Sequence, residues 1–111
     1  MQQDVDQFMI ETHIRTLATR RNLKLTTHAH QEMVAENIAT AELLSSLSCC
    51  SILENYPDHK RGACCLVCGQ ADSGRYIHVV CTTDRLELVI ITMYEPKPPK
   101  WGTPFKRGMR S

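Results

Sequence analysis

Hydrophobic residues in the second half of the chain form short runs that predict a β-sheet. Val, Ile, Leu, Cys and Tyr dominate these runs, and glycine, proline or acidic residues separate them. Such a composition between turn signals is typical of paired strands. The predicted strands cover residues 50–56, 62–69, 76–82 and 87–94. Pro96, Pro98 and Pro99 then end the sheet, because proline cannot donate to a strand ladder.

The first half of the chain has the wider spacing of apolar residues that is typical of helices. The predicted helices cover residues 4–21, 28–36 and 41–47. Thr27 and Thr40 are the expected N-caps of the second and third helices, and residues 24–27 form a short edge strand or an extended segment. The fold class is therefore α+β, with the N-terminal helices packed on one face of a four-stranded antiparallel meander.

The first predicted helix has apolar residues on two sides instead of one stripe. Phe8 and Met9 share one side, whereas Ile14 and Leu17 share the other. Its first turns are therefore expected to pack on something other than the core, and a second subunit is the candidate. We treat residues 1–23 as an N-terminal helix extension that favours a homodimer.

Size and composition indicate one ordinary globular domain. The chain has 111 residues, of which 42 % are hydrophobic and 23 % are charged. The longest uncharged apolar run, residues 88–94, is too short to span a bilayer, and the first residues lack the apolar segment of a secretory signal. We therefore expect a cytoplasmic protein without a membrane partner.

Charge is unevenly distributed along the chain. Residues 95–111 carry a net charge of +4, whereas residues 1–94 carry −3. Residues 97–111 are therefore read as a basic, flexible tail that either contacts phosphates or an acidic partner or is simply solvated. This division leaves residues 24–96 as the folded α+β domain.

The six cysteines do not have the spacing of a metal site. Cys65 and Cys68 form a C-x-x-C pair, but both lie in a predicted strand, where positions three apart point to opposite faces. A zinc site also needs a second pair, which the sequence lacks. We therefore predict six free thiols, with Cys64 and Cys81 as the one pair close enough to oxidise.

His78 is unusual because it lies inside a strand-like run, RYIHVVCTT at residues 75–83. The length of the following turn decides which face of the sheet it occupies. A two-residue turn places His78 among aliphatic residues, whereas a three-residue turn places it beside Thr92 and Tyr94. Burying one clean apolar face costs less than burying His78 among aliphatics, so we predict the second register. The predicted apolar face comprises Ile77, Val79, Cys81, Val89, Ile91 and Met93.

The polar face that this register creates suits metal-free cleavage of RNA. The reaction needs a base for the 2′-hydroxyl, an acid for the leaving 5′-oxygen and cations near phosphorus. His78 can act as base or acid near neutral pH, and Tyr94 can donate a hydrogen bond or a proton. A hydrogen-bonded structural histidine is the alternative interpretation of His78.

A second histidine and several other side chains are candidates to assist this chemistry. His28 begins the second predicted helix, where the dipole favours its neutral form, so it can act as a base or can merely cap and pack. Trp101 and Phe105 can stack on bases. The candidate phosphate ligands are Lys60, Arg61, Arg75, Lys97 and Lys100. This set requires neither a metal ion nor a cofactor.

Several short motifs occur in an order that resembles a known family. They read LTTHAHQEM at 25–33, ENYPD at 54–58, RYIHVV at 75–80 and LVIITMYEP at 88–96. Together they are similar to a bacterial and archaeal domain family of unknown function, over about residues 24–101. That family is related by fold to RelE- and BrnT-like toxins. The resemblance implies a toxin-like α+β fold, ribonuclease activity and an antitoxin-like protein partner.

All three proposed catalytic positions match the family pattern, but the second helix departs from it. His28 matches the histidine of the H-A motif, His78 matches that of H-V-V, and Tyr94 matches the tyrosine of the closing I-I-T-x-Y-x-P motif. Glu32 and Glu36 stand where the family usually has arginines, and Asn37 stands for glycine. These substitutions place negative charge where a phosphate-binding surface favours positive charge. Whether they end RNA cleavage is left open by the sequence.

Two functions therefore follow from the sequence. The first is a metal-independent ribonuclease of a toxin–antitoxin-like system, which acts on RNA and is blocked by an antitoxin-like protein. The second is a non-catalytic protein-interaction module with the same fold.

Overall fold

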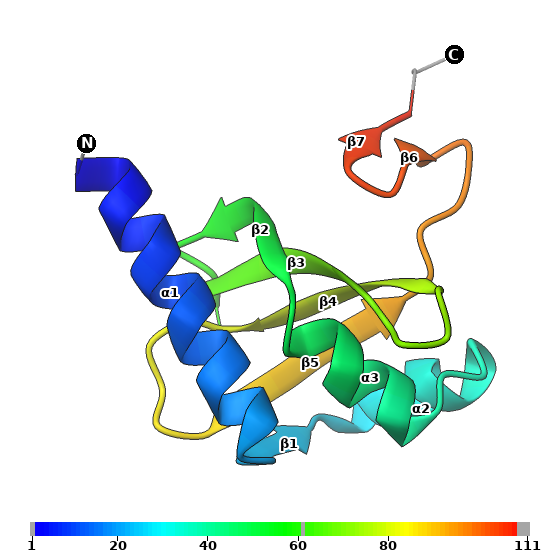
Figure 1. The fold of residues 1–111 in the computed structure, drawn as a ribbon, viewed down its shortest axis with the longest axis horizontal. Helices are drawn as coiled ribbons and strands as arrows, with labels where there is room; N and C mark the ends of the chain where they lie inside the picture. The colour runs from blue at the N-terminus through cyan, green and yellow to red at the C-terminus, as the bar shows by residue number, and fades with distance from the viewer. Residues whose placement is uncertain (1, 61, 109–111) are drawn as a thin grey trace.

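Three helices lie on one face of a five-stranded sheet in the computed structural model, which describes residues 2–60 and 62–108 (Figure 1). The helices are α1 (Gln2–Thr19), α2 (Thr27–Ala35) and α3 (Thr40–Leu47). The main sheet comprises β1 (Leu23–Leu25), β2 (Ser51–Tyr56), β3 (Cys64–Gln70), β4 (Tyr76–Thr82) and β5 (Leu88–Tyr94). Two further short strands follow, β6 (Trp101–Thr103) and β7 (Lys106–Arg107).

The main sheet is mixed, with strand order β1-β5-β4-β3-β2. The antiparallel meander predicted from the sequence is confirmed for β2 to β5. The prediction of a purely antiparallel, four-stranded sheet is wrong, because β1 adds a fifth strand parallel to β5. The backbone N–H of Leu88 donates to Asn22, and that of Thr26 donates to Ile90, so backbone hydrogen bonds hold both ends of β1.

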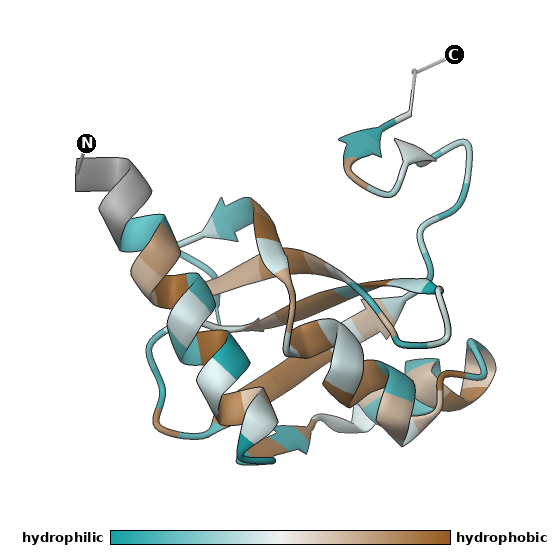
Figure 2. Cartoon of the chain, viewed as in Figure 1, coloured by the Kyte–Doolittle hydropathy of each residue, from teal (hydrophilic) through white to brown (hydrophobic). Residues whose placement is uncertain are grey.

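The main core lies between the helices and the facing side of the sheet. Ile14 of α1 and Leu47 of α3 are fully buried there, and Ile77 and Met93 meet them from the sheet. In Figure 2, brown, hydrophobic residues dominate the strands that lie beneath the helices. At the outer end of α1, Phe8 and Met9 are each 62 % exposed, which agrees with the two-sided pattern of this helix.

The starts of α2 and α3 differ by one residue from those predicted. Thr26 is the N-cap of α2, and its hydroxyl accepts from the backbone N–H of Ala29 at 3.0 Å. Ala39 is the N-cap of α3, and its own N–H donates to the Glu42 carboxylate at 3.0 Å. The expected caps, Thr27 and Thr40, are the first helical residues instead.

The strand register confirms that His78 shares a face with Tyr94 and lies away from Val79 and Met93. His78 pairs directly with Tyr94, and Val79 pairs with Met93. The predicted placement of Val89 and Ile91 on the apolar face is wrong. A β-bulge shifts the pairing so that Ile90, not Ile91, lies opposite Cys81. Leu88 and Ile90 are consequently buried in the main core, because one extra residue reverses the alternation of faces.

All six cysteines are free. The expected proximity of Cys64 to Cys81 is corrected by the register, which pairs Cys64 with Thr82 and Cys65 with Cys81. Within residues 2–60 and 62–108, no three His, Cys, Asp or Glu side chains are arranged to hold a metal ion. In the same residues, no helix has the length and apolar character needed to cross a membrane.

Residues 97–108, here called the strap, are folded where the sequence led us to expect a flexible tail. β6 and β7 form a hairpin at the end of a single connecting segment after β5 (Figure 1). Trp101 is only 3 % exposed. The charge of this segment suggested disorder, but one large aromatic side chain buried on the sheet anchors it.

Candidate active site

The face of the sheet opposite the helices carries the His78–Tyr94 pair. The two residues are direct cross-strand partners on β4 and β5, so their side chains project to the same side. The Tyr94 hydroxyl lies 3.2 Å from Nδ1 of His78, and the two rings are 5.2 Å apart. The sheet therefore fixes an imidazole and a phenol in hydrogen-bonding contact.

The strap completes the surroundings of His78 and determines its tautomer. Nε2 of His78 lies 2.6 Å from the carbonyl oxygen of Pro104, which can only accept a hydrogen bond. Nε2 must therefore carry the proton, and Nδ1 accepts from the Tyr94 hydroxyl. Both ring nitrogens are occupied in this arrangement.

His78 is fully buried beneath Trp101 of the strap. The two rings meet edge to face, with centroids 4.4 Å apart. This burial lowers the pKa of His78, although the hydrogen bond to Pro104 and the nearby Glu54 carboxylate oppose the shift. The imidazole is therefore neutral beneath the strap. The neutral imidazole is the form that can accept a proton.

Tyr94 is half-buried between the sheet and the strap. Burial raises the pKa of its hydroxyl, while the neighbouring Trp101 side chain opposes that shift. The Lys100 ammonium lies 5.4 Å from the centroid of the Tyr94 ring. Nε1 of Trp101 is itself buried beside the Tyr94 hydroxyl oxygen, in a contact that falls outside the geometry of a full hydrogen bond.

A charged cluster on β2 holds the far end of the strap. Arg107 donates two hydrogen bonds of 2.8 Å to the Glu54 carboxylate, and its guanidinium lies 4.7 Å from the centroid of Trp101. The Tyr56 hydroxyl donates to the same carboxylate. Arg107 lowers the pKa of Glu54, whereas burial and the Glu54 contact raise the pKa of Tyr56 to about 12.

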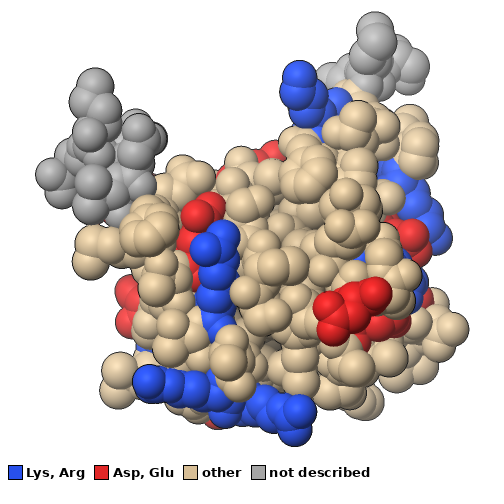
Figure 3. All heavy atoms as spheres, viewed as in Figure 1, with Lys and Arg blue, Asp and Glu red and all other residues tan. Residues whose placement is uncertain are grey.

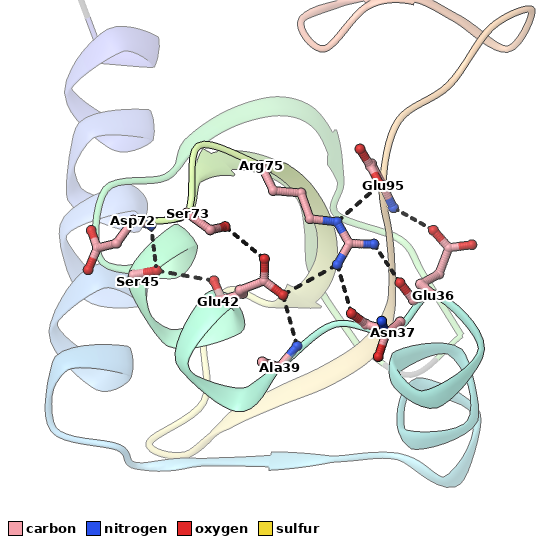
Figure 4. Close-up of polar contacts among 9 residues, drawn as sticks. All are labelled: Glu36, Asn37, Ala39, Glu42, Ser45, Asp72, Ser73, Arg75 and Glu95. Carbon is pink, nitrogen blue, oxygen red and sulfur yellow. Dashed lines mark hydrogen bonds and ion pairs between the residues drawn. The ribbon is translucent and has the colours of Figure 1, made fainter.

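Arg75, a predicted phosphate ligand, is engaged by the protein itself (Figure 4). Its guanidinium bonds the Glu95 and Glu42 carboxylates at 3.0 and 3.3 Å. It also donates to the backbone carbonyls of Glu36 and Asn37 at the end of α2. These four contacts join the α2–α3 turn to the sheet.

The other predicted site residues are not brought together at His78. His28 is exposed at the start of α2, and Lys60 and Lys97 are exposed in connecting segments. Arg61 lies outside the described residues. Trp101, expected to stack on bases, packs its ring against His78 instead. Of the predicted cations within the described residues, Lys100 has the contact with the His78–Tyr94 pair.

Sequence reasoning missed Glu54, Tyr56 and the role of Arg107. Glu54 and Tyr56 belong to the ENYPD motif and are two residues apart on one strand, so they point to the same face. That spacing was a signal from which the shared face of Glu54 and Tyr56 could have been predicted. The partner in the strap was not predictable, because no local pattern links residue 107 to β2.

Positive charge gathers over the strap. Its cations are Lys97, Lys100, Lys106 and Arg107, and the strap contains no acidic residue. Figure 3 shows Lys and Arg side chains over this part of the molecule, at the upper right. The His78–Tyr94 pair is thus covered by a segment with the charge that a polyanionic ligand attracts.

The sequence comparison identifies the central part of the chain. A family model described as a domain of unknown function, DUF4258, matches residues 25–95. The chain belongs to the DUF4258 family. The DUF4258 match contains both His78 and Tyr94, whereas α1 and the strap lie outside it. Comparisons with curated proteins and with solved structures found no match.

Proposed function

We propose that this DUF4258 protein is a metal-independent ribonuclease of the toxin type. The observation that carries the proposal is the His78–Tyr94 hydrogen bond on a sheet face that a cationic segment covers. The resemblance of the chain to proteins related by fold to RelE- and BrnT-like toxins supports the same reaction class. RNA is the proposed substrate, and an antitoxin-like protein is the proposed partner.

The proposed reaction uses the 2′-hydroxyl of RNA as the nucleophile. The 2′-oxygen bonds to phosphorus while the bond from phosphorus to the 5′-oxygen breaks, leaving a 2′,3′-cyclic phosphate and a 5′-hydroxyl. His78 takes the 2′-hydroxyl proton through Nε2, and the 5′-oxygen receives a proton from Tyr94 or solvent. The lysines of the strap, which stays joined to β5 when Pro104 leaves His78, offset the charge that develops on the phosphate oxygens.

The Tyr94 contact allows His78 to change tautomer. In the closed site Nε2 carries the proton, so Nε2 has no free lone pair. Once the Pro104 carbonyl is removed, the proton can lie on Nδ1 and donate to the Tyr94 oxygen instead. A hydroxyl both donates and accepts, so Tyr94 supports either tautomer. Nε2 then becomes the free base that the reaction needs.

The test compares RNA cleavage by wild type, His78→Ala and Tyr94→Phe under metal-free conditions, on isolated RNA and on translating ribosomes. We expect His78→Ala to abolish cleavage and Tyr94→Phe to reduce it. His30→Ala is the matched control, because His30 is an exposed histidine on α2. Cyclic-phosphate ends that form at the same rate with folded His78→Ala protein would overturn the proposal.

A second candidate function is a protein-interaction module, and a specific groove favours it. An apolar groove of about 530 Å³ lies between α2, α3 and β1. Its lining includes Leu25, Met33 and Leu44, and Val34 beside them is 69 % exposed. An apolar groove of this size suits side chains of a protein partner. Co-purification of a partner that Val34→Lys disrupts, with no RNA cleavage by wild type, would favour this function over the first.

A further inference from the structure

The strap meets the main sheet through contacts that always involve a side chain. β6 and β7 pair only with each other, in a separate two-stranded sheet. The backbone N–H groups of Trp101 and Gly108 donate to carbonyls of Lys97 and Lys100, which also lie within the strap. No backbone–backbone hydrogen bond joins the strap to β2–β5 in the part of the chain that the structure describes. The strap can therefore separate from the sheet without breaking the main ladder.

Among the described residues, one ion pair joins β7 of the strap to the main sheet. Arg107 forms its bidentate bond with Glu54 of β2, and we call this pair the latch. The side chains of Arg107 and Glu54 are 49 % and 28 % exposed. Water and dissolved anions therefore reach the latch, and a half-exposed ion pair is one that competing anions weaken.

The closed position blocks the His78–Tyr94 pair. The Pro104 carbonyl occupies Nε2 of His78, and Trp101 covers the imidazole, which has no exposed surface. A substrate can therefore reach the imidazole only when the strap moves.

We propose that the strap is an autoinhibitory cover, that the Arg107–Glu54 latch keeps it closed over His78 and Tyr94, and that RNA opens it. Phosphate oxygens compete with the Glu54 carboxylate for Arg107, and the three lysines of the strap favour a polyanion over a small anion. RNA thereby uncovers the imidazole at the moment it binds. The role of RNA rests on the proposed ribonuclease function, whereas the cover itself does not.

The position of the strap can be measured directly, because Trp101 is the only tryptophan in the chain. The experiment compares acrylamide quenching of Trp101 and carbethoxylation of His78, mapped by mass spectrometry, in wild type, Glu54→Gln and Arg107→Gln. Lys106→Gln is the matched control, since it removes the same charge from an exposed neighbour of Arg107. Loss of the latch should shift the ratio of open to closed strap by up to about fivefold, and quenching and modification should rise with it.

Trp101 quenching and His78 modification should rise in both latch variants, and Lys106→Gln should behave as wild type. Unchanged quenching and unchanged His78 modification in both latch variants, with circular dichroism showing a native fold, would overturn the cover. An equal response of Lys106→Gln would overturn the assignment of the latch. In wild type, a 2′-O-methyl oligoribonucleotide that cannot be cleaved should also raise the quenching of Trp101. No change at saturating oligoribonucleotide would overturn opening by RNA.

Activity then separates the two proposals. If Glu54→Gln is open and cleaves RNA faster than wild type, both the cover and the ribonuclease are supported. If Glu54→Gln is open and neither protein cleaves RNA, the ribonuclease fails and the cover remains. If Glu54→Gln is open and cleaves RNA at the wild-type rate, the strap does not inhibit, and the autoinhibitory role is overturned.

Discussion

The backbone of Gly69 in β3 lies directly against the carbonyl of Ser46 in α3. A Cβ atom placed on Gly69 would fall 1.8 Å from that carbonyl oxygen and 2.6 Å from its carbon. These are backbone atoms, so no side-chain rotation relieves the overlap. The glycine therefore sets how closely α3 packs on the sheet that carries His78. Gly69 directly follows Cys68, which is the cross-strand partner of His78.

Gly69→Ala should consequently destabilise the fold. Either α3 or β3 must shift to admit the methyl group, and overpacking of this kind costs about 1–3 kcal/mol in the free energy of unfolding. Urea denaturation followed by circular dichroism measures the loss. Gly102→Ala is the control, because a Cβ there meets its nearest atom at 3.5 Å, which is ordinary contact. Equal stability of the two variants would show that α3 does not pack as described.

The second prediction concerns Arg75, whose side chain is 19 % exposed. Arg75→Lys keeps the charge but loses the planar fork that reaches Glu42, Glu95 and the end of α2 together. Leaving the partly buried carbonyls without a donor should lower the free energy of unfolding by about 2 kcal/mol. Chemical denaturation provides the measurement, and Lys60→Ala, at an exposed position, should change it little. A fully stable Arg75→Lys protein would leave Arg75 available for the phosphate role predicted from the sequence.

The sequence determined the strand order of the meander and the face of His78, because period-two alternation is a local property of the chain. The predicted face of Ile91 was wrong because a single bulge residue reverses this alternation. The pattern of residue types along the chain does not reveal the bulge. The strands of the strap were missed for another reason. The charge of the strap was read along the chain, whereas its structure depends on the contacts of Trp101 and Arg107 with residues more than twenty positions away.

The candidate site was predicted in part. The sequence identified His78 and Tyr94, and the structure places them in contact. The prediction of phosphate ligands from their proximity to strand ends was less successful. Long basic side chains can reach partners within the protein that their position in the sequence does not reveal. Arg75 binds carboxylates and carbonyls of the protein. Glu36 accepts from the backbone N–H of Glu95 at 2.9 Å and thus supports the end of β5.

The third prediction is that only one thiol reacts rapidly in the native protein. Cys49 is exposed, and the other five cysteines are buried. Burial raises the pKa of Cys50 to about 12 and the pKa of Cys68 to about 11, which removes the reactive thiolate at neutral pH. Titration with a thiol reagent should therefore show one fast equivalent in buffer and six in denaturant. Cys49→Ser should abolish the fast equivalent. Any fast thiol that remains in that variant would show that one of the buried cysteine-bearing segments opens.

The last prediction concerns acid pH and the position of the strap. Burial holds the pKa of His78 in the closed site below its ordinary value of about 6.5, so the open state binds the proton more readily. The stability of the closed state relative to the open state is therefore complete above about pH 6.5 and declines as the pH falls toward the lowered pKa. Glu54, Lys100 and Arg107 surround His78, and Lys100 and Arg107 act in the same direction because their charge disfavours the imidazolium.

Glu54 adds a second step at lower pH. Arg107 lowers the pKa of its carboxylate, so the latch is fully formed above the ordinary glutamate value of about 4.3 and is lost as the pH falls through the lowered one. Trp101 quenching should accordingly rise below about pH 6.5 and rise again in the acid range. His78→Gln should lack the first rise and keep the second, because it removes the imidazole and retains Glu54. Quenching of wild type that stays constant from pH 7.5 to about pH 5, where the first rise is expected, would show that protonation of His78 does not lift the strap.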